Sequence, residues 1–285
     1  MRILLTGRNG QVGGELNKTL APLGELTALG RAELDLRDAA GVRDAVRAAK
    51  PEVIVNAAAY TAVDRAEAER EAAFAVNATA PGVLAEEAKR AGALLVHYST
   101  DYVFDGEKPA PYVEEDTPNP LNVYGASKLA GERAIAASGC RHLILRTSWV
   151  YGPRGSNFFL TMLRLAREKP ELRVVDDQVG APTSSLAIAR GTAQLLTRRA
   201  QGLYHMSAAG ETSWCGFARA ILSSAGLATA VVAIRTEDYP APAKRPRNSR
   251  LDCSRLRRDF GLSLAPWEEQ LAEVISCALR AGARE

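Results

Sequence analysis

The sequence predicts an α/β protein built on a doubly wound parallel sheet, with a smaller C-terminal lobe. First, short apolar runs alternate with longer helix-like stretches through the first 150 residues. Second, these runs are mostly continuous, which is typical of parallel strands buried on both faces. Third, a chain of 285 residues is long for one simple domain and short for two independent ones. Alternating strands and helices therefore predict βαβ units.

Each expected element follows from its own run of residues. The apolar runs predict strands at 2–6, 25–29, 52–56, 93–99 and 142–148. The stretches between them predict helices at 11–21, 38–49, about 67–91 and about 121–138, the last preceded by a proline-rich start signal and followed by a glycine. Beyond these the pattern loosens and predicts helices at 157–169, 184–198, 213–226 and 265–282, with short strands at 172–175 and 202–207.

A glycine triplet joins the first strand to the first helix. Gly7, Gly10 and Gly13 form G-x-x-G-x-x-G at this point. Glycine permits a tight turn and lets the backbone approach a pyrophosphate, while the helix N-terminus offers unpaired N–H groups to phosphates. The position of the triplet favours a Rossmann-like dinucleotide site over a plain strand–helix turn.

The end of the second expected strand indicates which dinucleotide binds. An NAD site normally has an acid there, on the ribose 2′-hydroxyl, whereas this chain has Gly30 and Arg31, with Glu33 coming later. A guanidinium suits the 2′-phosphate of NADPH, and Arg8 in the glycine loop is a second candidate. We therefore expect NADPH, with NADH left open.

Polar and small residues follow the next two strands. The third strand runs into the small residues of NAAAYT (56–61), against which a cofactor can lie, and the fourth ends on Ser99, Thr100 and Asp101. Tyr124 and Lys128 begin the next helix, where positions i and i+4 share a face. Because the carboxyl ends of parallel strands meet at one edge, we expect these groups to converge there.

This set of groups is what reversible carbonyl reduction needs. Hydride reaches carbon from a nicotinamide, and a positioned acid supplies the proton to oxygen. We expect Tyr124 to be that acid, Lys128 to lower the pKa of its phenol, and Thr100 to donate a hydrogen bond to the carbonyl oxygen. We therefore expect residues 1–150 to be a dinucleotide-binding domain, to which elements of about 171–212 return, and residues 151–170 and 213–285 to be a substrate-binding lobe.

Together these motifs resemble the extended short-chain dehydrogenase/reductase family, and within it the dTDP-4-dehydrorhamnose reductases. The resemblance covers the whole chain and is carried by VNAAAYTAVDRAE (55–67), HYSTDYVFDG (97–106), LNVYGASKLAGE (121–132), RTSWVYG (146–152), NFFLTMLRLA (157–166), DDQVGAPT (176–183) and RPRNSRLD (245–252). It implies reduction of the 4-keto group of dTDP-4-dehydro-L-rhamnose to dTDP-L-rhamnose by NADPH.

The resemblance also implies a role for individual residues. The residues at the cofactor phosphates would be Gly10, Gln11 and Val12, and those flanking the adenine would be Asp35 and Leu36. The segment Ala59, Tyr60 and Thr61 would pass beneath the cofactor, and Tyr98 would contact it. Thr100 and Asp101 would meet the sugar, and Trp149 would pack on the sugar ring. Lys128 would hold the nicotinamide ribose. Some members of the family carry an acid where Gly30 stands, which keeps NADH use open.

Two rival functions stay open. A sugar-nucleotide dehydratase or epimerase shares this fold, although dehydratases of the class tend to have Thr-Asp-Glu where this chain has Thr100-Asp101-Tyr102. The regulatory subunit of methionine adenosyltransferase also resembles the reductases and acts as a binding partner. The intact Thr100, Tyr124 and Lys128 favour catalysis.

Composition excludes other classes. No run approaches the roughly 18 apolar residues of a membrane span and no secretory signal is present, so we expect a cytoplasmic protein. The four cysteines and three histidines show no metal spacing, His97 in an apolar run is expected to be a core residue, and Mg²⁺ is not assigned.

The basic excess is local. Seven basic residues lie between Lys244 and Arg258, which suits a small anionic ligand better than nucleic acid. Arg245, Arg247 and Arg250 are candidates for the substrate diphosphate or for a subunit contact. A homodimer stays open.

Overall fold

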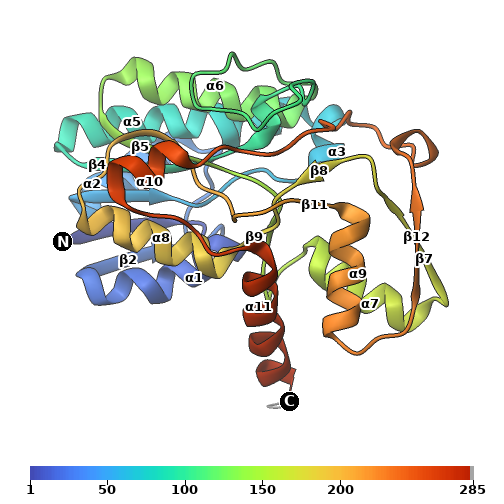
Figure 1. Ribbon diagram of the computed structural model, residues 1–285. Coiled ribbons are helices and arrows are strands. Elements are labelled where there is room, and N and C mark those ends of the chain that lie inside the picture. Colours follow the sequence, from blue (N-terminus) through green and yellow to red (C-terminus); the bar gives the residue numbers. More distant parts are fainter. Residues whose placement is uncertain (283–285) are drawn as a thin grey trace.

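The computed structural model describes residues 1–282 and is organised around a six-stranded parallel sheet (Figure 1). Its strands are β1 (Arg2–Thr6), β2 (Glu25–Leu29), β3 (Val53–Asn56), β4 (Leu94–Thr100), β5 (Arg141–Thr147) and β10 (Gly202–His205). Their order across the sheet is β10-β5-β4-β3-β1-β2. The order reverses between β1 and β3, and open α/β sheets bind ligands outside the carboxyl ends of the strands at such a point.

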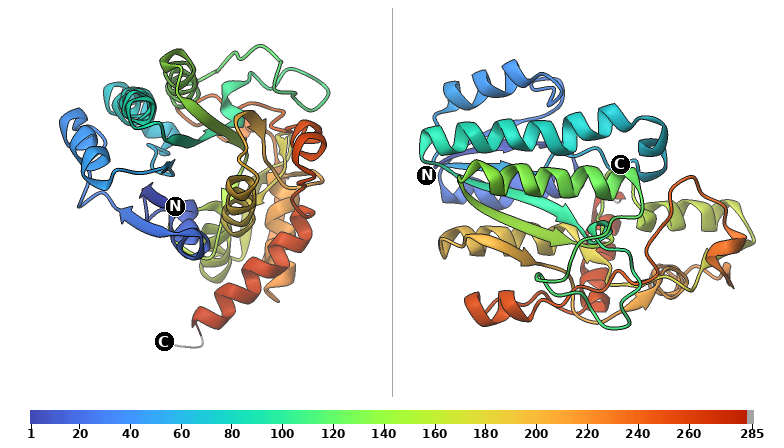
Figure 2. Two further views of the ribbon diagram at one scale, coloured as in Figure 1. Left: turned by 90° about the vertical axis from the view of Figure 1, so that its left-hand side faces the viewer. Right: turned by 90° about the horizontal axis from the view of Figure 1, so that it is seen from above.

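Helices cover both faces of this sheet (Figure 2). On one face lie α2 (Ala39–Ala49), α5 (Ala80–Ala91) and α6 (Val123–Ser138), and on the other lie α1 (Gln11–Leu20) and α8 (Ser185–Thr197). Successive strand residues point to opposite faces, so Leu4 enters the first core and Leu5 the second. The continuous apolar runs are thereby explained, since both faces need apolar residues.

The helix expected over about 67–91 is interrupted. The chain forms α3 (Val63–Ala68), α4 (Arg70–Phe74), a π-helical turn η2 (Ala75–Thr79) and then α5. The break falls at Glu69, whose φ of −108° and ψ of 41° leave the helical region. A π turn often marks a functional position, and here it places Asn77 against the loop that follows β3.

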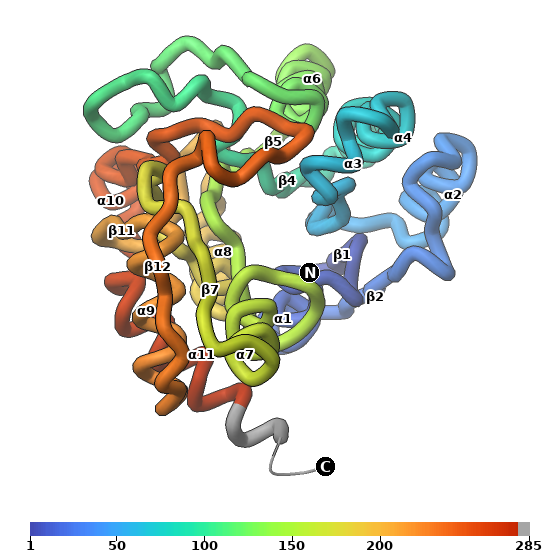
Figure 3. Tube along the Cα trace, turned by 90° about the vertical axis from the view of Figure 1, so that its right-hand side faces the viewer, coloured from blue at the N-terminus to red at the C-terminus, as the bar shows by residue number. Residues whose placement is uncertain are grey.

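The smaller lobe has its own core (Figure 3). It is formed by α7 (Phe158–Glu168), β7 (Glu171–Val175), α9 (Trp214–Ser224), β12 (Ala230–Ile234) and α11 (Trp267–Gly282). We expected elements of about 171–212 to return to the large sheet. This is wrong for β7, which pairs in parallel with β12 in a separate two-stranded sheet. The return is made by α8 and β10 instead.

Two of the longer elements, β12 and α10 (Ser254–Phe260), were not expected. The residues of β12 form an apolar run, yet most of them are solvent-exposed. The helix α10 has one buried residue, Leu256, which joins the core of the large sheet. The remaining short elements are η1 (Ala21–Leu23), η3 (Asp101–Val103), β6 (Val150–Tyr151), β8 (Val179–Gly180), β9 (Thr183–Ser184), β11 (Thr212–Ser213) and η4 (Thr236–Asp238).

Among residues 1–282, no helix is both long enough and apolar enough to cross a membrane.

Candidate active site

The turn after β1 contains two glycines at positions where a Cβ atom would clash with neighbouring backbone. Gly7 has a φ of +77°, and a Cβ there would lie 2.7 Å from the amide nitrogen of Ala58. A Cβ on Gly13 would lie 2.0 Å from the carbonyl oxygen of Gly7. Both contacts are far shorter than van der Waals distance, so this turn brings β1, α1 and the loop after β3 together only with glycine at these positions.

The N-terminus of α1 keeps its amide groups available. Gly10 is the N-cap and supplies no side-chain hydrogen bond, so the first N–H groups of the helix lack a capping partner. Such an end fits phosphate oxygens. Gln11 accepts a hydrogen bond from Asn157 of the lobe at 2.9 Å, while Val12 packs against the core. Gln11 therefore joins the glycine turn to the smaller lobe.

At the end of β2 a carboxylate folds back to the strand. Glu33 accepts a hydrogen bond from the amide of Gly30 at 2.9 Å and pairs with the guanidinium of Arg8 at 2.5 Å. Arg8 also donates to the carbonyl of Ala28. Arg31 is exposed and has no ion-pair partner among residues 1–282. Of the two arginines proposed for a 2′-phosphate, Arg31 is therefore the unengaged one.

The two residues expected near adenine have different surroundings. Asp35 pairs with Arg37 at 2.6 Å, and hydrogen bonds from Arg37 lower the pKa of Asp35 to about 2. Leu36 is buried in the core beneath α2. The Asp35 carboxylate is thus charged at neutral pH and sits next to a buried apolar residue.

The loop after β3 is fixed by a residue that sequence reasoning missed. Asn77 accepts from the amide of Tyr60 at 2.8 Å and donates to the carbonyl of Tyr60 at 3.0 Å. It also donates to the hydroxyl of Ser127 on α6 at 3.0 Å. The loop holding Ala59, Tyr60 and Thr61 is thereby tied to the helix that carries Tyr124. A buried asparagine in a helical stretch was the only signal available.

At the end of β4, Thr100 and Asp101 form a buried pair. The Thr100 hydroxyl donates to Asp101 Oδ1 at 3.0 Å and accepts from the amide of Tyr102 at 3.1 Å. The Asp101 carboxylate also interacts with the Ser249 side chain, while its buried Oδ2 lacks a hydrogen bond of ordinary geometry. Burial raises the pKa of Asp101 to about 6, against the hydrogen bonds that lower it. An unpaired acceptor at this edge is suited to a hydroxyl of a ligand.

Tyr124 lies in the first turn of α6, next to Thr100. Its ring meets that of Tyr102 edge-on at 5.6 Å. Burial raises the pKa of the Tyr124 phenol to about 12, while its hydrogen bond with Thr100 lowers this pKa and the charge of Asp101 raises it. Lys128 is not among the groups that shift this pKa in the structure, and its amine contacts Tyr98 and His97, so the lowering of the phenol pKa by Lys128 stays a prediction.

Lys128 is almost completely buried, at 2% exposure. Its Nζ donates to the carbonyl of Tyr98 at 2.6 Å and lies 3.2 Å from Nε2 of His97. Burial lowers the pKa of Lys128 to about 8, and the charge of Glu132 opposes this. The side chain of Tyr98 points elsewhere: its hydroxyl pairs with Thr192 of α8 at 2.7 Å. What Tyr98 offers at the site is therefore its backbone carbonyl.

The glycines of α6 near Tyr124 and Lys128 are explained by close packing against neighbouring backbone. A Cβ on Gly125 would lie 2.1 Å from the carbonyl oxygen of Tyr102, and one on Gly131 would lie 2.1 Å from that of Asn77. Asn122 caps the helix by accepting from the amide of Gly125 at 2.8 Å. The helix thus approaches two neighbouring segments more closely than alanine allows.

Trp149 occupies a strained position. It has a φ of 47°, which is rare for a bulky residue, and such strain clusters at functional sites. Its ring stacks on Trp214 at 3.7 Å and 9°, and a Cβ on Gly180 would come within 2.6 Å of it. Trp149 is 8% exposed. Trp214, which sequence reasoning missed, covers one face of the ring expected to meet a sugar.

Next to this tryptophan pair the lobe forms a pocket of about 830 Å³. Apolar and aromatic side chains line it, among them Phe158, Met162 and Trp214, and Lys244 and Arg245 bring positive charge. Arg245 pairs with Asp64 at 2.7 Å. Of the three arginines expected to hold a diphosphate or contact a subunit, only Arg245 lines this pocket.

The other two arginines lie apart. Arg250 pairs with Glu211 at 2.9 Å and donates to the carbonyl of Pro109. Arg247 is exposed, and its backbone carbonyl accepts from Val179. Neither lines the large pocket, so the basic residues that are close together in the sequence lie in different places in the structure.

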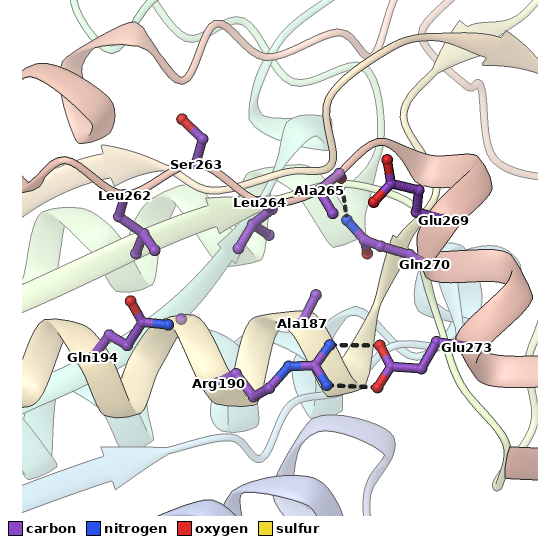
Figure 4. A pocket seen from close by; sticks show the side chains of 11 residues that line it. Ala187, Arg190, Gln194, Leu262, Ser263, Leu264, Ala265, Glu269, Gln270 and Glu273 are labelled. Atoms are coloured by element: carbon purple, nitrogen blue, oxygen red, sulfur yellow. Dashed lines mark hydrogen bonds and ion pairs between the residues drawn. The ribbon is translucent and has the colours of Figure 1, made fainter.

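A smaller hollow of about 270 Å³ lies between α8 and α11 (Figure 4). Arg190 on α8 donates two hydrogen bonds to the carboxylate of Glu273 on α11, and Gln270 donates to the carbonyl of Ala265. These contacts dock the last helix on α8. No residue of the strand ends lines this hollow, and no group of His, Cys, Asp and Glu side chains among residues 1–282 is arranged to hold a metal ion.

Comparison with known proteins gives consistent matches over nearly the whole chain. Residues 1–279 match the RmlD substrate binding domain family. The dTDP-4-dehydrorhamnose reductase of Burkholderia thailandensis is 51% identical, with 94% of this chain and 95% of that protein covered. The reductase of the same name from Escherichia coli (strain K12) is 45% identical at the same coverage.

Solved structures agree. The dTDP-4-dehydrorhamnose reductase of Bacillus anthracis in complex with NADP has a TM-score of 0.93 and 38% identity, covering 96% of this chain and 98% of that one. The UDP-glucose 4-epimerase of Thermus thermophilus in complex with NAD has a TM-score of 0.86 at 23% identity, covering 98% and 99%. The second likeness extends to the fold alone.

Proposed function

The chain belongs to the RmlD substrate binding domain family, and from that premise we propose that it reduces the 4-keto group of dTDP-4-dehydro-L-rhamnose to dTDP-L-rhamnose with NADPH. Relatives named for this reduction are 45% and 51% identical over almost the full chain. The observation that carries the proposal is the gathering of three groups at the strand ends: buried Thr100 at the end of β4, with partly buried Tyr124 and buried Lys128 one turn apart on α6.

The residues at this edge fit a dinucleotide. The uncapped amides of α1 follow a glycine turn, and the small residues of the loop after β3 lie beside it. When bound, the reduced nicotinamide supplies a hydride. Arg31 is proposed for the 2′-phosphate, and this favours NADPH over NADH.

The roles of the chain's own residues follow from their surroundings. Tyr124 keeps its proton at neutral pH because burial raises its pKa to about 12, so it can give that proton to a developing alkoxide. Thr100 lies beside the phenol and offers a hydroxyl to the same oxygen. Lys128 holds a ribose hydroxyl, and a positive charge there stabilises the phenolate that remains.

The nucleotide part of the substrate is assigned to the lobe. A thymidine diphosphate needs an apolar wall for its base and cations for its phosphates. The pocket of about 830 Å³ supplies both, with Trp214 and Phe158 as its aromatic wall and Lys244 and Arg245 as its cations. The sugar would then reach Asp101 and the Trp149 ring at the boundary between the lobe and the sheet.

The rival functions have less support. In the dehydratase-like motif the third position is Tyr102, whose ring packs on Tyr124 and supplies no carboxylate. A regulatory role needs a partner protein, and it does not require Thr100, Tyr124 and Lys128 to lie together at the strand ends. We place the protein in the cytoplasm, without a nucleic-acid partner. Light scattering on the purified chain tests whether it is a homodimer.

The decisive experiment is the loss of reduced-nicotinamide absorbance on mixing the pure protein with dTDP-4-dehydro-L-rhamnose. NADPH and NADH are compared in parallel, each with and without Mg²⁺. We expect stoichiometric loss, faster with NADPH. Binding of NADPH without its consumption would overturn the reductase proposal in favour of an epimerase or a regulatory subunit.

A further inference from the structure

A row of buried polar side chains lies behind Lys128. Thr6, Asn56 and His97 end or nearly end three adjacent strands, and their registers place them side by side on β1, β3 and β4. All three are 1% exposed. They lie on the face of the sheet that α5 and α6 cover, directly beyond the apolar row Leu4–Ile54–Leu95. The catalytic scheme above uses none of them.

Hydrogen bonds connect this row to the lysine. The Thr6 hydroxyl donates to Asn56 Oδ1 at 2.7 Å, Asn56 Nδ2 lies 3.1 Å from His97 Nδ1, and His97 Nε2 lies 3.2 Å from Lys128 Nζ. The amide of Ala58 also donates to Asn56 Oδ1, at 3.3 Å. Because Oδ1 accepts hydrogen bonds from both Thr6 and Ala58, the side-chain amide of Asn56 is held with Nδ2 toward the imidazole.

This orientation decides which imidazole nitrogen carries the proton. Asn56 Nδ2 can only donate, so Nδ1 of a neutral His97 must accept and Nε2 must carry the hydrogen. That hydrogen points at Nζ of Lys128, where a neutral amine can accept it and an ammonium group cannot. An ammonium would need His97 with its proton on Nδ1 and Asn56 turned over, which would set Nδ2 against the amide of Ala58.

We propose that Asn56 and His97 are positioning residues that act through Lys128, fixing where its amine lies and coupling its charge to the tautomer of His97. The contacts that support this proposal do not depend on the proposed reductase function; only the predicted effect on catalysis rests on it. The amine that holds the ribose and faces the product phenolate would then be poised between its two charge states, rather than permanently charged.

The other charged and titratable groups around Lys128 are few. Tyr124 precedes it by one turn on α6, and Glu132 follows by one turn and pairs with Arg146 of β5 at 2.7 Å. The pKa of Lys128, which burial lowers to about 8, is raised by Glu132. Burial and the charge of Lys128 both lower the pKa of His97, so the imidazole is neutral and only its tautomer can change.

The experiment is nuclear magnetic resonance of the whole chain, without substrate or cofactor. Nitrogen-15 shifts report the tautomer of His97, one of three histidines, and carbon-13 at Cε reports the charge of Lys128, one of seven lysines. In the wild-type chain we expect the Nε2–H tautomer above the titration midpoint of Lys128. A protonated Nδ1 at every pH would overturn the proposal.

Two variants extend the test. Asn56→Asp supplies a carboxylate that accepts a hydrogen bond from Nδ1–H. This leaves Nε2 free to accept a hydrogen bond from an ammonium group and should raise the Lys128 midpoint by about one pH unit. His97→Gln can turn its oxygen to Nζ and should shift the midpoint in the same direction. His205→Gln is the matched control, because His205 is equally buried but contacts Tyr112 and Glu114. It should leave the midpoint unchanged.

A steady-state readout follows from the same variants. In Asn56→Asp the alkaline limb of kcat should move up with the Lys128 midpoint, while a purely structural role would lower only thermal stability. An unchanged midpoint in folded Asn56→Asp overturns the proposal and leaves the reductase function untouched. A shifted midpoint without turnover in the wild type supports the positioning role and rejects the reductase function.

Discussion

At the scale of single residues, the surroundings decide the chemistry. Asp101 is buried and Tyr124 is partly buried, and desolvation raises the pKa of the tyrosine to about 12 and that of the aspartate to about 6. For the tyrosine this preserves a proton for transfer at neutral pH. For the aspartate it means that a charged carboxylate is held against desolvation, with only one of its oxygens hydrogen-bonded.

The Tyr124 phenol can be tested by removing one oxygen atom. We expect Tyr124→Phe to bind NADPH within about twofold of the wild type and to lose turnover by about 10²–10⁴-fold, the usual contribution of a positioned acid. Fluorescence titration gives the first quantity and NADPH oxidation the second. Tyr102→Phe removes the same atom from the neighbouring ring and should keep most activity. Equal losses in both would argue against Tyr124 as the donor.

Asp101 predicts a pH dependence of stability. Its pKa rises from 3.8 to about 6 on folding, so the folded chain binds this proton more tightly than the unfolded chain. The resulting stability is complete below about pH 4 and is lost as the pH rises through about 6. Asp101→Asn removes this dependence.

Urea unfolding of both proteins between pH 4 and 7.5 measures the effect. Between pH 4 and pH 7.5, the unfolding free energy of the wild type should fall by about 2–3 kcal/mol more than that of Asp101→Asn. Parallel curves for the two proteins would show that Asp101 has an ordinary pKa.

At the scale of elements, the approach of α6 to its neighbours builds the site. Glycines at 125 and 131 let the helix lie against the carbonyl oxygens of Tyr102 and Asn77. The π turn at η2 aims Asn77 at both the loop after β3 and Ser127 of α6. The cofactor loop and the catalytic helix are therefore positioned by one shared side chain.

Replacing glycine by alanine should have opposite effects on two adjacent helices. In Gly125→Ala the new Cβ would lie 2.1 Å from a backbone oxygen, so α6 must shift, and we expect a loss of about 1–3 kcal/mol in unfolding free energy with a large fall in kcat. In Gly82→Ala of α5 the nearest atom is 3.4 Å away. That variant should gain up to about 1 kcal/mol. Thermal or urea unfolding distinguishes the two signs.

At the scale of the whole molecule, the strand order switches between β1 and β3, and the smaller lobe has a separate core. We expect the cofactor at the strand-order switch and the substrate at the lobe. The lobe is entered several times along the chain, and Gln11 and Asn157 join the two sides directly. The site lies where these two bodies meet.

Cofactor binding should stabilise the entire fold. NADPH at about 100 times its Kd should add about 2.7 kcal/mol to the unfolding free energy. At equal concentration NADH should raise Tm less, because Arg31 then lacks a phosphate. In Arg31→Asp the order of the two Tm shifts should reverse. A wild type stabilised equally by both cofactors would place the 2′-phosphate away from Arg31.

Much of this fold was readable from the sequence because its signals are local. Continuous apolar runs predicted the strands within a residue or two, glycine spacing predicted the first turn, and the Tyr124–Lys128 interval predicted a shared helix. The run Ala230–Ile234 is equally apolar but was not predicted as a strand, and only the fold shows that it pairs with β7 while most of its side chains stay exposed.

Partners distant in sequence were decided by the tertiary structure alone. The sequence determined that Tyr124 and Lys128 are one turn apart; only the fold turned the Lys128 amine toward His97 and Tyr98. It also stacked Trp149 on Trp214 and sent Arg245 and Arg250 to different surfaces. The physical reason is that helical spacing is a property of neighbouring residues, whereas burial, hydrogen-bond partners and pKa depend on which distant segments pack together.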